Sequence, residues 1–415
     1  MFQNGEYQLD LTRRLAFNRL GGTDDELRAA CILQSEIGDA AGFEEFEIPG
    51  YVVQKARLRV LEPFTREIPV TGVGFSGSTP EAGLTAPFAY AQEGSETDLT
   101  DVRGKIILLN SNPREIWKKV LDSGAAGFLI ISGAYNDEDE RTDLERTYLR
   151  DYMLRDGRIP GLTLRTRDAI ELVRGGATLV NMELTQNEHM LTSRNVVAEI
   201  PGTDKADEII VFTAHYDSVP FSYGAWDNAS GSADLMALYL WFRENPPRRT
   251  LRFIWCGSEE RGLLGSIAYV KAHMDEISRF RFGINIDMTG PVIGHDRAIV
   301  TSDIGLQTML EYFARERGHS LSVSQAPYSS DSTPFSDAGV PTVSFHRAGQ
   351  AAGHSRYDLP EPLGSAAFAK TWNFIREFAE KTVNSAVVPV PREIPQNMKD
   401  EIDKYFHRTP NPPKP

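Results

Sequence analysis

From residue 195 onward, apolar runs of strand length alternate with helix-length stretches, and this alternation most constrains the fold. The predicted strands are residues 195–200, 208–214, 251–255, 282–286 and 340–345, and the predicted helices between them are 230–243, 266–273 and 306–318. Such alternation is typical of a largely parallel or mixed sheet that helices cover on both faces. We therefore predict an α/β fold with a mixed, mostly parallel central sheet flanked by helices.

Acidic and imidazole side chains follow the predicted strands, directly or after a short turn: His215, Glu259, Glu260 and Asp287. In open α/β sheets, ligands collect at the carboxyl ends of the strands. Because neighbouring residues in an extended segment point to opposite sides, Glu259 and Glu260 can do two jobs, one facing a metal and the other a water. Oxygen and imidazole donors without thiolate suit a catalytic site for zinc, manganese or cobalt.

Length and charge restrict the classes of protein and partner. A chain of 415 residues is too long for one simple core, so two domains are the starting expectation. The formal net charge of −14 argues against nucleic-acid or anionic-membrane partners, and no apolar run is long enough to span a bilayer. The first residues lack a basic segment followed by an apolar one. This predicts a cytoplasmic protein, or a secreted one if the sequence begins after its leader.

The composition changes along the chain and predicts its domain organisation. Residues 1–46 have helical patterns and form an N-terminal part of the main domain. Residues 47–187 contain short strand-like runs broken by Gly, Pro and Ser clusters, which indicates an inserted β-rich domain. Residues 188–385 hold the alternating pattern of the main domain. The Pro-rich residues 386–415 are interpreted as a C-terminal arm without assigned chemistry.

Short motifs follow one another in a specific order: His-x-Asp at 215–217, Gly-Ala-x-Asp-Asn at 224–228, Glu-Glu-x-Gly-Leu-x-Gly-Ser at 259–266 and Gly-His-Ser at 353–355. Together they resemble the clan MH co-catalytic zinc aminopeptidases, a group that includes bacterial leucyl aminopeptidases, glutamate carboxypeptidase II and the transferrin receptor ectodomain. The resemblance covers residues 1–385. Within it, residues 47–187 resemble the protease-associated domain, a small β-rich module inserted into several exopeptidases.

The resemblance implies a pair of zinc ions, for which manganese or cobalt could substitute. His215 and Asp287 would bind one ion, Glu260 and His354 would bind the other, and Asp227 would bridge them. Two cations so placed would lower the pKa of a water and polarise the scissile carbonyl.

Further roles follow from the same resemblance. Glu259 would be the general base, and Asp217 would hold the ring of His215. Several relatives have a tyrosine before the final histidine, where this chain has Gly353, so Tyr328 is assigned as the donor to the oxyanion. Asp331 is placed beside the site. The residues assigned to a substrate side-chain pocket are Phe221, Tyr223 and Trp226.

The implied function is hydrolysis of N-terminal residues from peptides with a free N-terminus. A carboxypeptidase or dipeptidase of the same fold is the first alternative, in which Arg347 and Arg356 could meet a substrate carboxylate. A glutaminyl-cyclase-like acyltransferase with one zinc and a non-catalytic receptor-like module are further alternatives, and the complete ligand set argues against both. The side-chain preference stays open, and so does assembly into a homo-oligomer.

Overall fold

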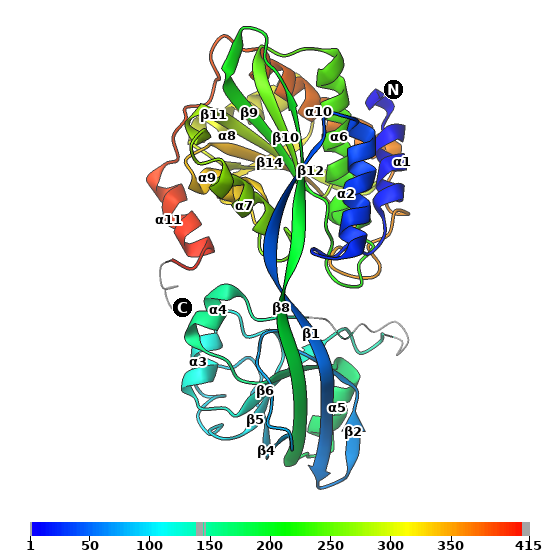
Figure 1. The fold of residues 1–415 in the computed structure, drawn as a ribbon, viewed down its shortest axis with the longest axis vertical. Helices are drawn as coiled ribbons and strands as arrows, with labels where there is room; N and C mark the ends of the chain where they lie inside the picture. Colours follow the sequence, from blue (N-terminus) through cyan, green and yellow to red (C-terminus); the bar gives the residue numbers. More distant parts are fainter. Residues whose placement is uncertain (1, 138–143, 145–146, 409–415) are drawn as a thin grey trace. The chain divides into compact units, whose positions relative to one another are not determined.

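The computed structural model describes residues 2–137, 144 and 147–408, and the chain divides into two compact units (Figure 1). The main unit consists of Met1–Ile48 and Leu191–Pro415, and the inserted unit is Pro49–Met190. The divisions fall within two long strands, β1 (Gly42–Glu62) and β8 (Leu179–Ile200), close to the boundaries predicted at residues 47 and 187. Residues 409–415 of the predicted arm lie outside the described residues.

The main unit is built on a mixed sheet with the strand order β13-β12-β14-β11-β9-β10-β8. The neighbours β14, β11, β9 and β10 run parallel, whereas β8 is antiparallel to β10. Strand β12 is antiparallel to β14 and parallel to β13. The predicted α/β fold class is confirmed. The strands are β9 (Lys205–His215), β10 (Arg249–Cys256), β11 (Phe280–Ile286), β12 (Gly294–Thr301), β13 (Leu321–Gln325) and β14 (Thr342–Gly349).

Helices cover both faces of this sheet, and the alternation of side chains along β9 shows how. Ile210 and Phe212 pack in a core with α1, α2, α6, α8 and α10, whereas Ile209 and Val211 pack on the other face with α7 and α9. The helices of the main unit are α1 (Glu6–Leu15), α2 (Asp24–Ile37), α6 (Gly231–Glu244), α7 (Leu264–Ala272), α8 (Ile304–Glu316), α9 (Ser332–Asp337), α10 (Ser365–Asn384) and α11 (Gln396–Tyr405).

Several predicted boundaries are wrong for identifiable reasons. The strand predicted at 195–200 is the end of a much longer strand, β8, because the half-exposed middle of β8 lacks an apolar run. The strands β12 and β13 were not predicted, since β13 alternates between partly buried and exposed residues at the edge of the sheet and β12 begins with exposed residues. The helical pattern assigned to residues 1–46 ends at Ile37, because the next residue, Gly38, adopts a φ of 83°.

In the inserted unit, the strand order continues from β8 as β4-β5-β6-β7-β3, and β1 pairs with both β2 and β8. Two apolar clusters form its core. Its likeness to a protease-associated domain stays a prediction. Its remaining elements are β2 (Arg66–Ile68), β3 (Val70–Gly72), β4 (Leu84–Tyr90), β5 (Ile106–Leu109), β6 (Gly127–Ser132), β7 (Gly161–Arg165), α3 (Trp117–Asp122), α4 (Asp151–Asp156) and α5 (Thr166–Arg174).

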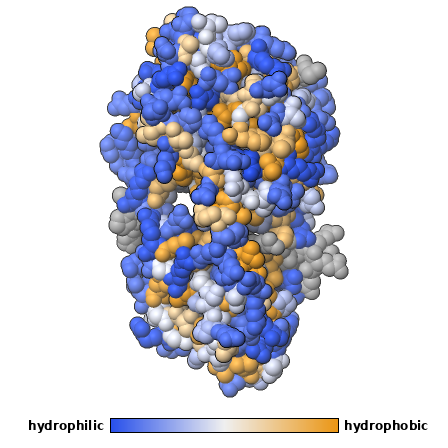
Figure 2. All heavy atoms as spheres, in the orientation of Figure 1, coloured by the Kyte–Doolittle hydropathy of each residue, from blue (hydrophilic) through white to orange (hydrophobic). Residues whose placement is uncertain are grey.

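Hydrophilic residues make up most of the visible surface of each unit, with apolar patches between them (Figure 2). In the part of the chain that the structure describes, no helix has the length and hydropathy needed to cross a membrane.

A buried ion pair joins strand β12 to its neighbour β14 in the main sheet. Asp296 on β12 is 3% exposed and accepts hydrogen bonds from Thr371 Oγ1 (2.7 Å) and Arg347 Nη1 (3.1 Å). Nε2 of His319 lies 2.9 Å from its other oxygen. Burial by itself would raise the pKa of Asp296, but these partners outweigh burial and hold the pKa below its usual value.

We expect Asp296→Asn to lower the free energy of unfolding by about 3–5 kcal/mol, because the substitution leaves the buried charge of Arg347 without its partner. The wild-type contribution is present above the pKa of an unfolded aspartate, about 3.9, and is lost as the pH falls through the lower folded value. Urea unfolding as a function of pH measures both effects.

Asp204→Asn is the matched control, because Asp204 pairs with Arg248 at the surface, where an ion pair contributes at most about 1 kcal/mol. Equal losses in the two variants would contradict a special role for the buried pair.

Candidate metal centre

The sheet brings the acids and imidazoles together because their strands are parallel neighbours. His215 is the last residue of β9 and lies opposite Cys256, the last residue of β10. Asp287 directly follows β11, which pairs with the other side of β9. A turn after β10, in which Ser258 has a φ of 55°, carries the chain to Glu259. The carboxyl ends of three adjacent strands therefore converge on one place.

Asp227 stands between two groups of side chains and offers one carboxylate oxygen to each. Its Oδ1 lies 3.1 Å from His215 Nε2, which lies 3.4 Å from Asp287 Oδ1. Its Oδ2 lies 3.0 Å from His354 Nε2, which lies 3.3 Å from Glu260 Oε2. Within each group, the nitrogen and oxygen atoms all lie within 4.8 Å of one another. The structure thus brings together all five residues predicted as metal ligands.

Glu259 lies beside these groups and is held by Asp217. The Oε2 of Glu259 is 3.9 Å from His215 Nε2, and Glu259 is 8% exposed. The two oxygens of Asp217 accept hydrogen bonds from the backbone N–H groups of Glu259 (2.9 Å) and Glu260 (3.2 Å). Asp217 also lies 3.5 Å from His215 Nδ1. Asp217 therefore holds the backbone of the turn that contains both glutamates. The sequence predicted only that it would hold the ring of His215.

Burial and crowding perturb the pKa of several groups in the cluster. Burial raises the pKa of Glu259 well above its usual value and that of Glu260 to about 7. Hydrogen bonds to Asp227 and Glu260 raise the pKa of His354 to about 11. The causes differ, since burial disfavours the charged form of the glutamates, whereas the neighbouring carboxylates favour the positive charge of His354 against the effect of burial.

The donor set fits zinc. Imidazole nitrogens and carboxylate oxygens without thiolate are typical of catalytic zinc sites. The residues that can ligate are largely buried, with His354 the most exposed. Two of the groups that could hold a metal ion share Asp227.

The remaining predicted residues differ in burial and in their electrostatic surroundings. Burial, followed by the charges of Asp287 and Asp227, raises the pKa of Tyr328, so its phenol stays protonated and able to donate. Burial likewise raises the pKa of the fully buried Asp331 to about 6. The aromatic residues predicted to form a pocket differ in exposure: Phe221 and Tyr223 are 37% and 46% exposed, and Trp226 is partly buried.

Arg347 does not support the carboxypeptidase alternative. It is 5% exposed, and it donates hydrogen bonds to Pro291 O (2.7 Å) and to Asp296. Its guanidinium is therefore occupied within the fold.

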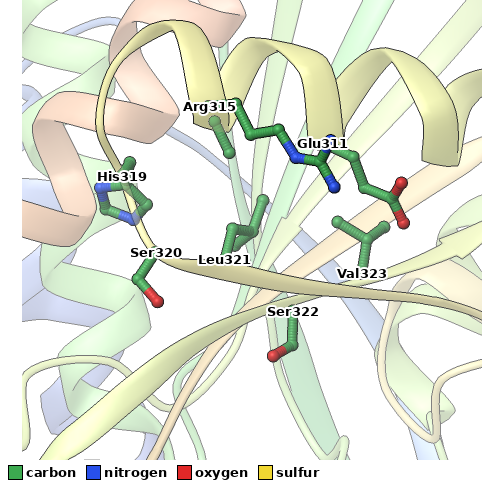
Figure 3. Close-up of a pocket in the computed structure, with 8 residues that line it drawn as sticks. Glu311, Arg315, His319, Ser320, Leu321, Ser322 and Val323 are labelled. Atoms are coloured by element: carbon green, nitrogen blue, oxygen red, sulfur yellow. The ribbon is translucent and has the colours of Figure 1, made fainter.

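A surface pocket between α8 and β13 is separate from the metal cluster, because its lining residues include no member of that cluster (Figure 3).

Sequence reasoning missed residues that act on the backbone around the cluster. Asp358 is fully buried and accepts hydrogen bonds from the N–H groups of Trp226 (2.7 Å) and Asp227 (3.0 Å). The ring of His346 lies between those of Trp226 and Tyr328, at centroid distances of 5.8 Å and 6.3 Å. The only available signal for Asp358 was its position four residues after His354.

Comparison with known proteins shows what this chain resembles. Residues 195–379 match Peptidase family M28. Among curated relatives, Aminopeptidase YwaD of Bacillus subtilis (strain 168) is 29% identical over 341 residues, which cover 79% of this chain and 71% of that protein. Carboxypeptidase Q of Mus musculus is 27% identical over 317 residues, covering 69% and 65%. The solved structure of BSAP, a zinc aminopeptidase from Bacillus subtilis, has a TM-score of 0.78 at 24% identity and covers 95% of this chain and 98% of that one.

We expect Asp358→Asn to weaken zinc binding about 10- to 100-fold, as substitutions behind metal ligands generally do. The amide can accept only one of the two backbone hydrogen bonds and sets its own N–H₂ against the other, so the segment with Asp227 shifts. Zinc affinity is measured by competition with a chromophoric chelator.

Asp303→Asn provides the control. Asp303 accepts backbone hydrogen bonds from Gly305 and Leu306 at the start of α8, and asparagine is an equally good cap there. Zinc affinity that is unchanged in Asp358→Asn, or lowered equally in both variants, would refute the role of Asp358.

Proposed function

Since residues 195–379 match Peptidase family M28, we propose that this chain is a zinc-dependent aminopeptidase that uses two ions. Its substrates are peptides with a free N-terminus. The observation that carries the proposal is the shared carboxylate of Asp227, whose oxygens face two separate sets of donors. The similarity to proteins named aminopeptidases supports the activity.

His215 and Asp287 are assigned to one ion and Glu260 and His354 to the other, with Asp227 shared between them. When bound, the ions supply a water of lowered pKa and polarise the scissile carbonyl. Manganese or cobalt can use the same donors. All five ligands come from the main unit, at or beyond the ends of its strands.

Glu259 acts as the general base. Its carboxylate lies beside the ligands and is not assigned to either ion, so it can take a proton from a water held there. Its raised pKa favours keeping that proton long enough to deliver it to the leaving amine. Tyr328, whose phenol stays protonated, donates to the oxygen that becomes negative in the tetrahedral intermediate.

The free amino group of the substrate is positively charged, and the cluster is rich in carboxylates. We assign Glu259 and Asp287 to hold it, since their oxygens lie 3.9 Å and 3.4 Å from His215 Nε2, within the cluster. A peptide with a blocked N-terminus lacks this charge, which accounts for selection of free N-termini. Phe221, Tyr223 and Trp226 remain our candidates for contacts with the first side chain.

We expect Glu259→Gln to keep its zinc while kcat falls about 10²- to 10⁴-fold, because the substitution removes the proton acceptor and leaves the ligands in place. Metal content and kcat are measured on the same preparation. Glu311→Gln, in the separate pocket of Figure 3, should change neither. Full activity in Glu259→Gln would exclude Glu259 as the base.

The similarity to Carboxypeptidase Q keeps a carboxypeptidase, which removes residues from the C-terminus, as the second candidate. Blocked dipeptides separate the two. We expect hydrolysis of a dipeptide with an amidated C-terminus and none of a dipeptide with an acetylated N-terminus. A chelator should abolish the activity and added zinc restore it. The reverse preference would identify a carboxypeptidase, and cleavage only of the unblocked dipeptide would identify a dipeptidase.

A further inference from the structure

Arg19, between α1 and α2, has a fully buried side chain that donates only to backbone carbonyl groups. Its Nε donates to Tyr216 O, and its Nη1 and Nη2 donate to Tyr223 O and Gly224 O, each at 2.7 Å. Further bonds from Nη1 reach two carbonyls of its own segment, Leu15 O (2.8 Å) and Phe17 O (3.1 Å). A single planar group therefore joins three stretches of chain.

Two of these stretches carry metal-binding residues. Tyr216 lies between His215 and Asp217, and Gly224 comes three residues before Asp227. The backbone of Arg19 strengthens the connection, since its N–H donates to Ser218 Oγ at 3.1 Å. One guanidinium thus links the strand end with His215 to the segment with Asp227.

The close approach of Gly224 shows how tightly this contact is built. Gly224 has a φ of 57°, and a Cβ atom on it would lie 2.7 Å from Asp227 O and 2.8 Å from both Nη2 of Arg19 and Cβ of Ser218. A side chain there would crowd all three groups. The glycine of the Gly-Ala-x-Asp-Asn motif therefore allows the guanidinium of Arg19 to approach together with the backbone at Asp227.

The charge of Arg19 is balanced by the metal cluster itself. A buried guanidinium is costly unless negative groups lie near it. Burial lowers the pKa of Arg19 to about 10, against the opposing charges of Asp217, Asp358, Asp227 and Glu260. The side chain is hence cationic at neutral pH and offsets part of the repulsion among these carboxylates.

We propose that Arg19 is the positioning residue of the metal centre. It fixes the separation of His215 and Asp227 by holding the carbonyls next to them, and its charge stabilises the carboxylates that bind the ions. Arg19 lies outside residues 195–379, so the N-terminal segment completes a site that the matched family region does not contain in full. This inference rests on the proposed metal-dependent function.

The test is zinc affinity in Arg19→Lys and Arg19→Met, measured by competition with a chromophoric chelator. Lysine keeps the charge but lacks the planar fork, and methionine removes both. We expect both variants to bind zinc about 10- to 100-fold more weakly, with the larger loss in Arg19→Met. The visible spectrum of the cobalt-substituted protein should also change in Arg19→Lys, because the ligand geometry changes. Wild-type affinity and spectrum in Arg19→Lys would overturn the proposal.

Arg249 offers a matched control. It is also fully buried and donates to two carbonyls, Val383 O and Ser385 O, but it begins β10, whereas the cluster lies beyond the other end of that strand. Arg249→Lys should lower stability and leave zinc affinity unchanged. Equal loss of zinc affinity in Arg19→Lys and Arg249→Lys would reduce the role of Arg19 to general stability and overturn the proposal. If Arg19→Met does not fold, the two lysine variants decide.

The wild-type protein separates the possible failures. If it binds no zinc and hydrolyses no free-amine peptide, the proposed function fails. If the wild type does both and the Arg19 variants bind zinc normally, only the role of Arg19 fails.

Discussion

The structure depends on keeping several carboxylates close together in a place that is nearly free of water. Glu259, Glu260, Asp227 and Asp287 are packed around His215, with Asp217 directly behind them. Such groups repel one another strongly in a medium of low dielectric constant. Protons, cationic side chains and divalent metals can balance this charge. The fold raises the pKa of Glu259 and Glu260, buries Arg19 nearby and groups the donors that can bind a metal.

The parallel strands supply position, and the segments around them supply rigidity. The strand ends alone would leave the turns after them free to separate the ligands. Asp217 accepts hydrogen bonds from backbone N–H groups of the segment with the two glutamates, and Asp358 does so for the segment with Asp227. Arg19 donates hydrogen bonds to backbone carbonyls of the same region. Glu26 on α2 adds a further link, because its Oε1 accepts hydrogen bonds from Ser193 (2.6 Å) and Ser258 (3.4 Å). The ligands are thus held mainly through the backbone next to them.

The difference between metal ligands and residues that hold the backbone explains how much of the site could be predicted from the sequence. The ligands were identifiable because metal binding requires particular side chains at particular strand ends, as with His215 and Asp287. Arg19 and Asp358 were not, because residues that bind backbone atoms leave no matching side chain elsewhere in the sequence. The edge strand β13 was missed for a related reason, since partial exposure removes the apolar run that marks a strand. The cytoplasmic location and the homo-oligomer stay predictions.

The whole inserted unit separates the N-terminal 48 residues from the remainder of the main unit. During synthesis, Arg19 and Glu26 therefore leave the ribosome long before Tyr216, Gly224 and Ser258, whose atoms they bind, and His354 comes later still. Contacts of such large sequence separation form late. A nascent chain can thus complete the inserted unit while the metal cluster of the main unit is still unformed.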